Sequence, residues 1–305
     1  LLNIKFKREC RAKNQVIQTA ISELLPLTKE RNTRESILKH PPTANAYICG
    51  SDQVWNFVKC FDDPTYFFDF TKSMKNVKRI GYAPSIADPW PKSRWEEFKG
   101  YLSHMDFISV REKNDVPVVE KLSGKPVRHV VDPVFLKTRE YWDNLSQNMN
   151  IKEHYIFCYF LGTNDLAVNL VNKVKQLTGF KIVHLNLNAR DRFNSDYNLR
   201  AVSPQQFIGL IKNASYVCTN SFHCSAFSII FRKNYFVAPK GFANARMESL
   251  QEMFGLNNRM FTQELIGGMT IEQMTVDYSK ADEKFAPFKE KSLRYLNNAL
   301  YGEPN

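Results

Sequence analysis

Residues 216–231 read Y-V-C-T-N-S-F-H-C-S-A-F-S-I-I-F, and this stretch decides the fold that we predict. Its first apolar residues stop at the small polar residues Thr219, Asn220 and Ser221, and from Phe222 onward apolar side chains recur at helical spacing. The pattern predicts a strand, a turn and the start of a helix. Such a helix start offers backbone N–H groups and the positive end of the helix dipole to an anionic ligand.

His223 lies in the first turn of this predicted helix. Two interpretations are open at this point. In one, the turn presents His223 to a ligand. In the other, the serine and threonine only cap the helix and the histidine packs against the protein. The pattern alone favours neither.

The same succession of strand, polar junction and helix recurs along the chain. Short apolar runs predict further strands at 46–49, 77–83, 107–110, 127–131, 155–161, 181–185 and 234–238. Helical patterns lie between them, for example at 14–39, 91–102 and 204–213, and again in the C-terminal tail at 287–301.

Strands that alternate with helices in two successive sets are typical of an α/β protein with two doubly wound parallel sheets. We therefore predict two Rossmann-like domains facing each other across a cleft. The N-terminal domain is expected at residues 1–140 and the C-terminal domain, with its C-terminal helix, at residues 141–305.

Polar residues directly follow several predicted strands, where an open α/β sheet forms its ligand crevice. Gly50, Ser51, Asp52, Gln53 and Trp55 come after the first strand. Glycine permits a tight turn, and the polar side chains can then face the crevice. Alternatively, the serine and aspartate only cap the next helix, and the tryptophan belongs to the core, which we consider the more common position, rather than stacking on a sugar.

Two other strand ends carry candidate ligands. Arg111 follows the strand at 107–110, where its planar guanidinium would suit a carboxylate or phosphate. The commoner fate of such an arginine is an ion pair, here with Glu112 or Asp115. Gly162 and Thr163 follow the strand at 155–161 and could cradle a phosphate.

Composition and charge narrow the function classes. With 305 residues, 43% of them hydrophobic, the chain is long enough for two globular domains. A net charge of +11 suits an anionic partner. Because no helix-turn-helix or aromatic RNA-binding motif accompanies this charge, we expect no nucleic-acid partner.

Targeting and metal-binding signals are not found in the sequence. No apolar run approaches the ~20 residues of a membrane span, and no signal peptide is recognisable. We expect a cytoplasmic protein whose basic N-terminal segment is compatible with peripheral contact with an anionic membrane. The six cysteines and six histidines show no ligand spacing, which predicts reduced thiols and no metal site.

Four segments together resemble the polysaccharide pyruvyl transferase family. They are G-S-D-Q-V-W-N at 50–56, S-V-R-E at 109–112, V-D-P at 131–133 and T-N-S-F-H-C-S-A-F-S-I-I-F at 219–231. The resemblance covers roughly residues 45–260. Around the histidine, relatives usually have Asp and Gly where this chain has Asn220 and Cys224. The family's N-terminal strand has no counterpart before Leu1, so the first domain is expected to lack that strand.

This resemblance implies a fold similar to the GT-B glycosyltransferases, with phosphoenolpyruvate as donor and a glycan or lipid-linked oligosaccharide as acceptor. The product would be a pyruvate ketal in a bacterial surface polysaccharide, with no cofactor besides the co-substrate. Histidines exchange protons near neutral pH, which makes His223 the candidate general acid.

The expected donor ligands are Arg111, Thr163, Asn220, Ser221 and Arg246. The expected acceptor ligands are Ser51, Asp52, Gln53 and Trp55.

Three alternatives remain beside this hypothesis. The chain could be a nucleotide-sugar glycosyltransferase of the same two-domain plan. It could also be an inactive glycan-binding homologue, because Asn220 and Cys224 depart from the family pattern. Within the turn, Cys224 could act as a covalent nucleophile instead of His223, provided that a base activates it.

Overall fold

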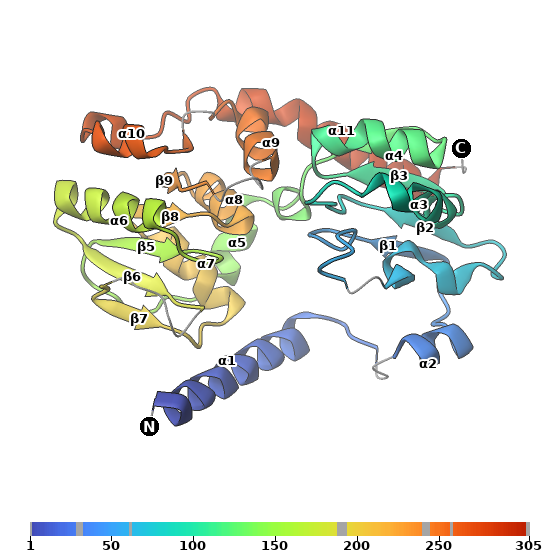
Figure 1. Cartoon of the computed structure of the whole chain (residues 1–305), viewed down its shortest axis with the longest axis horizontal. Helices are drawn as coiled ribbons and strands as arrows, with labels where there is room; N and C mark the ends of the chain where they lie inside the picture. The colour runs from blue at the N-terminus through green and yellow to red at the C-terminus, as the bar shows by residue number, and fades with distance from the viewer. Residues whose placement is uncertain are drawn as a thin grey trace. The chain divides into compact units, whose positions relative to one another are not determined.

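The computed structural model describes residues 2–28, 33–60, 63–187, 194–239, 245–256 and 259–302, with side chains from residue 8 onward. The chain forms two compact units, each assembled from separate segments. The first unit contains Thr28–Leu136, Ala243–Gly255 and Ala281–Asn305, and the second contains Leu1–Leu27, Lys137–Phe242 and Leu256–Lys280. Figure 1 labels the elements of both units.

The first unit is built on a four-stranded parallel sheet of order β1-β2-β3-β4. Its strands are β1 (Ala46–Cys49), β2 (Lys78–Gly81), β3 (Phe107–Val110) and β4 (Val127–His129). Helices α3 (Trp95–Leu102) and α4 (Val116–Ser123) cover one face, where Ile108 and Val110 join their core. Helix α11 (Ala281–Tyr301) covers the other face, where Phe107 packs near Ala299.

An aromatic cluster fills the core beneath α3. Trp55 has no exposed surface and stacks on Phe67 with ring centroids 4.9 Å apart, and Trp90 stacks on Phe98 at 4.1 Å. The Trp55 indole therefore belongs to the core, which is the alternative that the sequence left open. A fully buried ring offers no face to a sugar.

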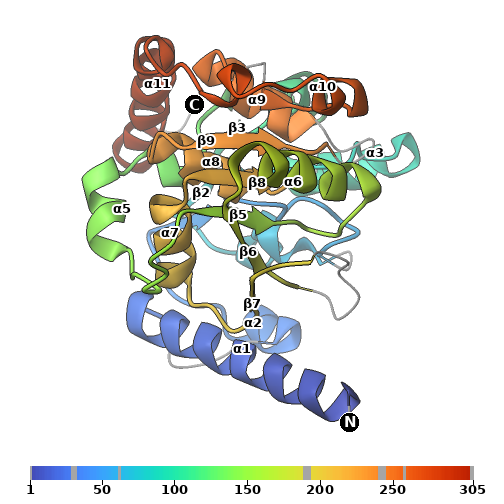
Figure 2. The ribbon, with the colours of Figure 1, turned by 90° about the vertical axis from the view of Figure 1, so that its left-hand side faces the viewer.

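The second unit is built on a five-stranded parallel sheet of order β7-β6-β5-β8-β9 (Figure 2). Its strands are β5 (Tyr155–Tyr159), β6 (Lys181–Leu185), β7 (Tyr197–Leu199), β8 (Tyr216–Thr219) and β9 (Asn234–Val237). The short strand β7 was not predicted. It carries two partly exposed residues around an exposed one instead of an apolar run.

Helices cover both faces of this second sheet. Ile156 and Cys158 of β5 pack with α6 (Asp165–Thr178) and α10 (Gln263–Gly267), while Phe157 faces α7 (Pro204–Asn213). Helix α8 (Phe222–Ile230) lies next to α7, and α5 (Arg139–Leu145) packs against α7 as well. Helices on both faces of parallel sheets confirm the predicted α/β fold of two Rossmann-like units.

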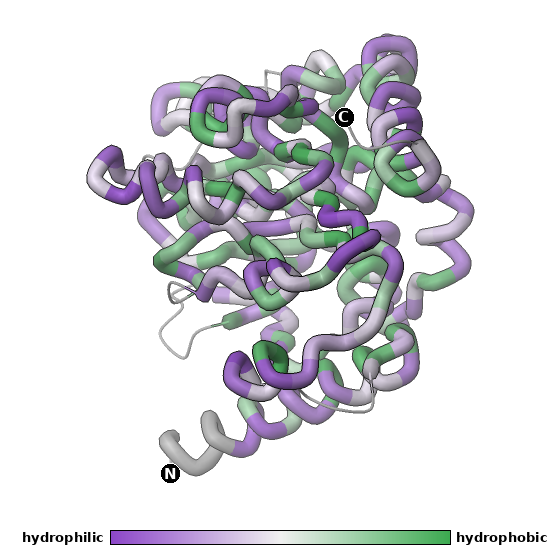
Figure 3. Tube along the Cα trace, turned by 90° about the vertical axis from the view of Figure 1, so that its right-hand side faces the viewer, coloured by the Kyte–Doolittle hydropathy of each residue, from purple (hydrophilic) through white to green (hydrophobic). Residues whose placement is uncertain are grey.

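Two terminal helices join units other than those expected from a division at residue 140. Helix α1 (Leu2–Leu24), with apolar and hydrophilic residues alternating along it (Figure 3), belongs to the second unit, and its Glu9 pairs with Arg200 at 2.9 Å. Helix α11 belongs to the first unit, because Ser292 accepts the Val131 N–H at 2.9 Å and Lys78 donates to the Leu300 carbonyl at 3.0 Å.

The ends of two predicted helices also differ. The pattern at 14–39 forms two helices, α1 and α2 (Arg34–Lys39). Helix α9 spans Ala245–Phe254. Helix α11 begins at Ala281, before the expected start at Pro287. Phe285 of this first part stacks on Phe254 at 4.2 Å, and that packing extends the helix ahead of the proline. None of the described helices is long and apolar enough to span a bilayer.

The turn after β1 depends on a glycine. At Gly50, φ is +125°, and an added Cβ would lie 1.9 Å from the carbonyl oxygen of Tyr82. Gly124 also has a positive φ, +66°, but an added Cβ there would meet nothing within 4 Å.

We expect Gly50→Ala to lower the free energy of unfolding by at least about 3 kcal/mol, and Gly124→Ala by about 1 kcal/mol. Both variants carry the backbone cost of a left-handed residue, but only the first adds a steric clash. Urea unfolding of the two proteins measures the difference. Equal losses of stability in the two variants would show that the clash with the Tyr82 carbonyl does not contribute to the free energy of unfolding.

Candidate functional site

The carboxyl edge of the first sheet gathers polar side chains from three loops. Ser51, after β1, places its Oγ 2.8 Å from Oδ2 of Asp132, which follows β4, and 3.0 Å from the carbonyl oxygen of Ala83, after β2. Arg111, directly after β3, donates from Nη1 to the same Asp132 oxygen at 2.9 Å. The predicted residues Ser51 and Arg111 are therefore neighbours.

Three carboxylates surround the Arg111 guanidinium, and only 1% of the Arg111 side chain is exposed. Glu112 pairs with Nε at 2.9 Å, Asp132 with Nη1 at 2.9 Å and Asp52 with Nη2 at 3.5 Å. Burial opposes the positive charge, but the charges of Glu112 and Asp132 outweigh it and raise the pKa of Arg111. The ion pair with Glu112 that the sequence suggested is confirmed, and both of its side chains are buried.

Asp115 extends this network. Burial, followed by the adjacent charge of Glu112, raises the pKa of the Asp115 carboxyl to about 7. One oxygen of each carboxyl, Glu112 Oε2 and Asp115 Oδ2, has no hydrogen-bond partner among the described residues. Two adjacent buried carboxyls that share one proton fit this arrangement, since two like charges at close range disfavour ionisation of both.

Arg246, near the start of α9, is the second arginine at this edge. Gln53, with its amide oxygen facing the guanidinium, accepts from Nη1 at 2.5 Å and Nη2 at 2.9 Å. Burial, and next the charge of Arg111, lower the pKa of Arg246. Its Nε is buried and has no partner in the described part of the chain. Arg246 thus keeps an unused donor, and no carboxylate of the described residues lies at ion-pair distance from it.

Asp52 differs from the other carboxylates because 60% of its side chain is exposed, against 1% for Asp132. Asp52 has φ of +66°, and its carbonyl oxygen accepts from the N–H of Ser85 at 2.8 Å. The backbone of this loop is therefore held while the carboxylate reaches solvent. The exposed Asp52 carboxylate can accept a hydrogen bond from a ligand hydroxyl, whereas the buried Asp132 carboxylate pairs with Arg111.

The β8–α8 junction in the second unit has the predicted strand, turn and helix. Ser221 caps α8 by accepting the Cys224 N–H at 3.4 Å, and its own N–H donates to Thr219 Oγ1 at 3.0 Å. The cap predicted as the structural alternative is thus present. His223, in the first turn, is half-buried, and its ring lies edge-on to Phe222 with centroids 5.4 Å apart. Ser221 therefore caps the helix, and the His223 side chain is nevertheless partly accessible.

Asn220 connects this junction to the loop after β5. Its Oδ1 accepts the Leu161 N–H at 2.7 Å and its Nδ2 donates to the Gly162 carbonyl at 3.1 Å. Thr163 follows at once and is half-buried, and Asn164 then caps α6. The loops that carry Thr163, Asn220 and Ser221 are therefore adjacent at the carboxyl edge of the second sheet.

Cys224 is fully buried, and burial raises the pKa of its thiol to about 12. A thiol of this kind is protonated at neutral pH and has no access to a substrate. The geometry therefore favours the histidine of the turn over the cysteine as the reactive group.

Sequence patterns had not identified Asp132 as a member of the network. Asp132 lies in the V-D-P segment just beyond β4, so its position after a strand was a usable signal. Within the described ranges, no group of three or more His, Cys, Asp or Glu side chains is arranged to hold a metal ion.

The shared proton at Asp115 predicts a pH dependence of stability. An unfolded aspartate titrates near 3.9, so between about pH 4 and 7 the folded protein keeps a proton that the unfolded chain has lost. Stability should fall as the pH rises through this window, with a slope of at most about 1.4 kcal/mol per pH unit.

Asp115→Asn keeps an N–H donor toward Glu112 and should remove that slope, as measured by urea unfolding across the window. Glu248→Gln, on the exposed side of α9, is the control and should keep the wild-type slope. Identical profiles for wild type and Asp115→Asn would contradict the shared proton.

Comparison with solved structures supports the fold. A putative UDP-N-acetylglucosamine 2-epimerase from Listeria monocytogenes matches with a TM-score of 0.51 and 11% identity, over 95% of this chain and 78% of that chain. UGT89C1 of Arabidopsis thaliana has a TM-score of 0.42 and 9% identity over 87% and 70% of the two chains. The glycotransferase of kitacinnamycin has a TM-score of 0.42 and 11% identity over 87% and 75%. At such identities the likeness concerns the fold alone.

Sequence comparison gives the family. The chain matches none of the curated proteins with which it was compared. The model of the polysaccharide pyruvyl transferase family matches residues 7–237, which supports a transferase that modifies glycans in polysaccharide biosynthesis. Because this match spans far more than half of the 305 residues, the chain belongs to the polysaccharide pyruvyl transferase family.

Proposed function

We propose that this protein transfers the enolpyruvyl group of phosphoenolpyruvate to two hydroxyls of one glycan sugar and so forms a pyruvate ketal. The family match over residues 7–237, which includes His223 at the start of α8, carries this proposal. The acceptor would be a glycan or a lipid-linked oligosaccharide of a bacterial surface polysaccharide, such as a capsule or exopolysaccharide. No further cofactor is required by this chemistry.

The proposed reaction has four bond changes. C3 of phosphoenolpyruvate takes a proton and becomes a methyl group, and one acceptor hydroxyl adds to C2. The bond between C2 and the bridging oxygen breaks, phosphate leaves, and the second hydroxyl adds to C2. Of the two protons released by the hydroxyls, one balances the proton taken up by C3 and the other leaves with phosphate.

His223 is the proposed general acid for the proton that goes to C3. Its half-buried ring lies in the first turn of α8, and the Ser221 cap together with Thr219 fixes the backbone of that turn. A positioned imidazole can pass a proton at neutral pH, and the helix N-terminus favours an anionic group beside it. Thr163, Asn220 and Ser221, which lie on neighbouring loops, are proposed donor contacts.

Residues of the first unit supply further candidates. Arg246 has an unused Nε donor and is the proposed cation for a carboxylate or phosphate oxygen of the donor. Arg111 stays a predicted donor contact, although three carboxylates already compensate its charge. Ser51, Asp52 and Gln53 are proposed to orient the acceptor, with the exposed Asp52 carboxylate accepting from a sugar hydroxyl.

A nucleotide-sugar glycosyltransferase is the second candidate, because two Rossmann-like units suit that class as well. The protein is proposed to work in the cytoplasm, with peripheral contact with the membrane where a lipid-linked acceptor would lie. Thermal unfolding separates the two donors, since only the true donor binds and stabilises the folded protein. Stabilisation by UDP-sugars and not by phosphoenolpyruvate would reverse the proposal.

We expect His223→Gln to lower ketal formation by about 10²–10⁴-fold, the usual contribution of a general acid, while phosphoenolpyruvate still raises the unfolding temperature. Phosphate release from phosphoenolpyruvate with a panel of lipid-linked or aryl hexosides measures the rate. His154→Gln, on the exposed surface of the same unit, is the matched control and should keep wild-type activity. Wild-type turnover by the His223 variant would exclude the assignment.

For Arg246→Gln we expect the dissociation constant of phosphoenolpyruvate to rise about tenfold or more, because a charge-assisted hydrogen bond is lost. The exposed Lys92→Gln removes the same charge elsewhere in the first unit and should leave donor binding unchanged. Titration calorimetry measures both. An unchanged constant for the Arg246 variant would remove this residue from the donor site.

A further inference from the structure

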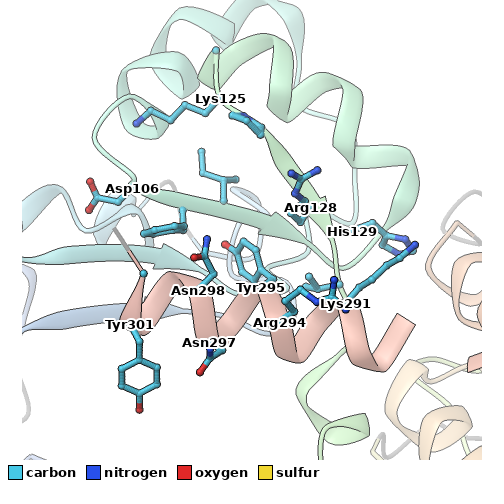
Figure 4. A pocket seen from close by; sticks show the side chains of 16 residues that line it. Asp106, Lys125, Arg128, His129, Lys291, Arg294, Tyr295, Asn297, Asn298 and Tyr301 are labelled. Atoms are coloured by element: carbon cyan, nitrogen blue, oxygen red, sulfur yellow. The ribbon is translucent and has the colours of Figure 1, made fainter. Parts of the chain in front are cut away.

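A large pocket of the first unit lies beside β4, apart from the residues assigned so far. Its volume is about 1040 Å³, and α11 forms one wall while β3, β4 and the loop between Gly124 and Pro126 form the other. Figure 4 shows Arg128, His129 and Lys291 toward one end and Asp106 toward the other. This volume lies at the upper end of those usual for ligand pockets, so the pocket has room for more than one small molecule.

The charges lining this pocket are mostly positive. Arg128 and Lys291 are exposed and have no ion-pair partner among the residues that the structure describes, while Arg294 pairs with Glu290 at 2.6 Å on the open helix surface. The one acidic lining residue, Asp106, is already used, because its Oδ2 accepts the Arg79 N–H at 2.8 Å. The two cations without an ion-pair partner thus lie toward one end of the pocket, Arg128 on the strand wall and Lys291 on the helix wall.

A second pocket, of about 800 Å³, shares Arg128 and His129 with the first. Its other wall contains Ser249 of α9, whose buried Oγ lacks a hydrogen-bond partner among the described residues. The first pocket alone follows the chain from Lys125 to Val130, roughly 16 Å at ~3.3 Å per residue. Adjoining pockets of this extent suit a chain-like ligand.

We propose that these adjoining pockets bind a stretch of acidic polysaccharide. This inference rests on the proposed function, in which each transferred pyruvate adds a carboxylate to the glycan and makes the polymer anionic. Arg128 and Lys291 would contact carboxylates, and the Asn298 amide, which points toward the strands in Figure 4, would bond sugar hydroxyls. The polymer would be held at this site while its reacting sugar contacts the proposed acceptor ligands Ser51, Asp52 and Gln53.

The lining favours a glycan over a nucleic acid. Single-stranded nucleic acids need accessible aromatic faces for base stacking. The Tyr295 hydroxyl donates to the Gly81 carbonyl at 2.9 Å with the ring packed on the core, and Tyr301 points away from the strands (Figure 4). Amides and hydroxyls beside guanidinium and ammonium groups match the hydroxyl and carboxylate pattern of an acidic sugar chain.

The test measures binding of a fluorescently labelled uronic-acid hexamer to the full chain by fluorescence anisotropy. Labelled maltohexaose is the neutral reference, and a single-stranded oligonucleotide of equal charge is the second probe. We expect the hexamer to bind best, with affinity falling as salt rises. The double variant Arg128→Glu, Lys291→Glu should weaken hexamer binding about tenfold or more.

The control variant Lys75→Glu, Lys92→Glu makes the same change in net charge at exposed positions of the same unit and should bind the hexamer like wild type. Equal losses in both variants, no loss in either, or equally tight binding of the oligonucleotide would each overturn the proposal. Unfolding temperatures report whether the variants fold. Phosphate release with a short aryl hexoside should persist in the pocket variant, and its absence in wild type would count against the proposed reaction alone.

Discussion

The buried guanidinium of Arg111 constrains the whole carboxyl edge of the first sheet. A charge removed from water must be paired and hydrogen-bonded, and here the partners come from loops after β1, β3 and β4. The loop after β1 can reach Arg111 only by crossing the end of β2. Gly50 permits that crossing, because the Tyr82 carbonyl occupies the place where a side chain would begin. One buried cation therefore fixes the position of Ser51 and Asp52.

This pairing also separates the roles of like residues. Asp132, almost fully buried, compensates Arg111, whereas Asp52 keeps most of its side chain in solvent. Arg111 is surrounded by carboxylates, whereas Arg246 has a neutral amide and a neighbouring positive charge. An anionic ligand would be attracted to the cation that has the least compensation. Exposure and pairing, more than residue type, thus distinguish structural groups from those open to a substrate.

The sequence predicted the strands and helices that depend on local patterns of residues. The strands of both sheets apart from β7 were recognisable from short apolar runs, and the helix predicted at 204–213 is α7. Long-range packing was not predictable. Trp55 is buried by aromatic rings that come later in the chain, and α11 packs on the first sheet although it ends the sequence. The partners of Arg111 likewise lie up to 60 residues away.

Asn220 and Cys224 stand beside His223 where relatives usually have Asp and Gly. The contacts of the two residues explain why they suit these positions. Asn220 uses one atom as an acceptor, toward the Leu161 N–H, and the other as a donor, toward the Gly162 carbonyl. An ionised aspartate could accept the first hydrogen bond but could not donate the second. Asparagine therefore suits the bridge between these two loops. Cys224 fills a fully buried space under the turn, where its size stabilises packing and its thiol stays protonated. Both residues therefore support the backbone around the histidine.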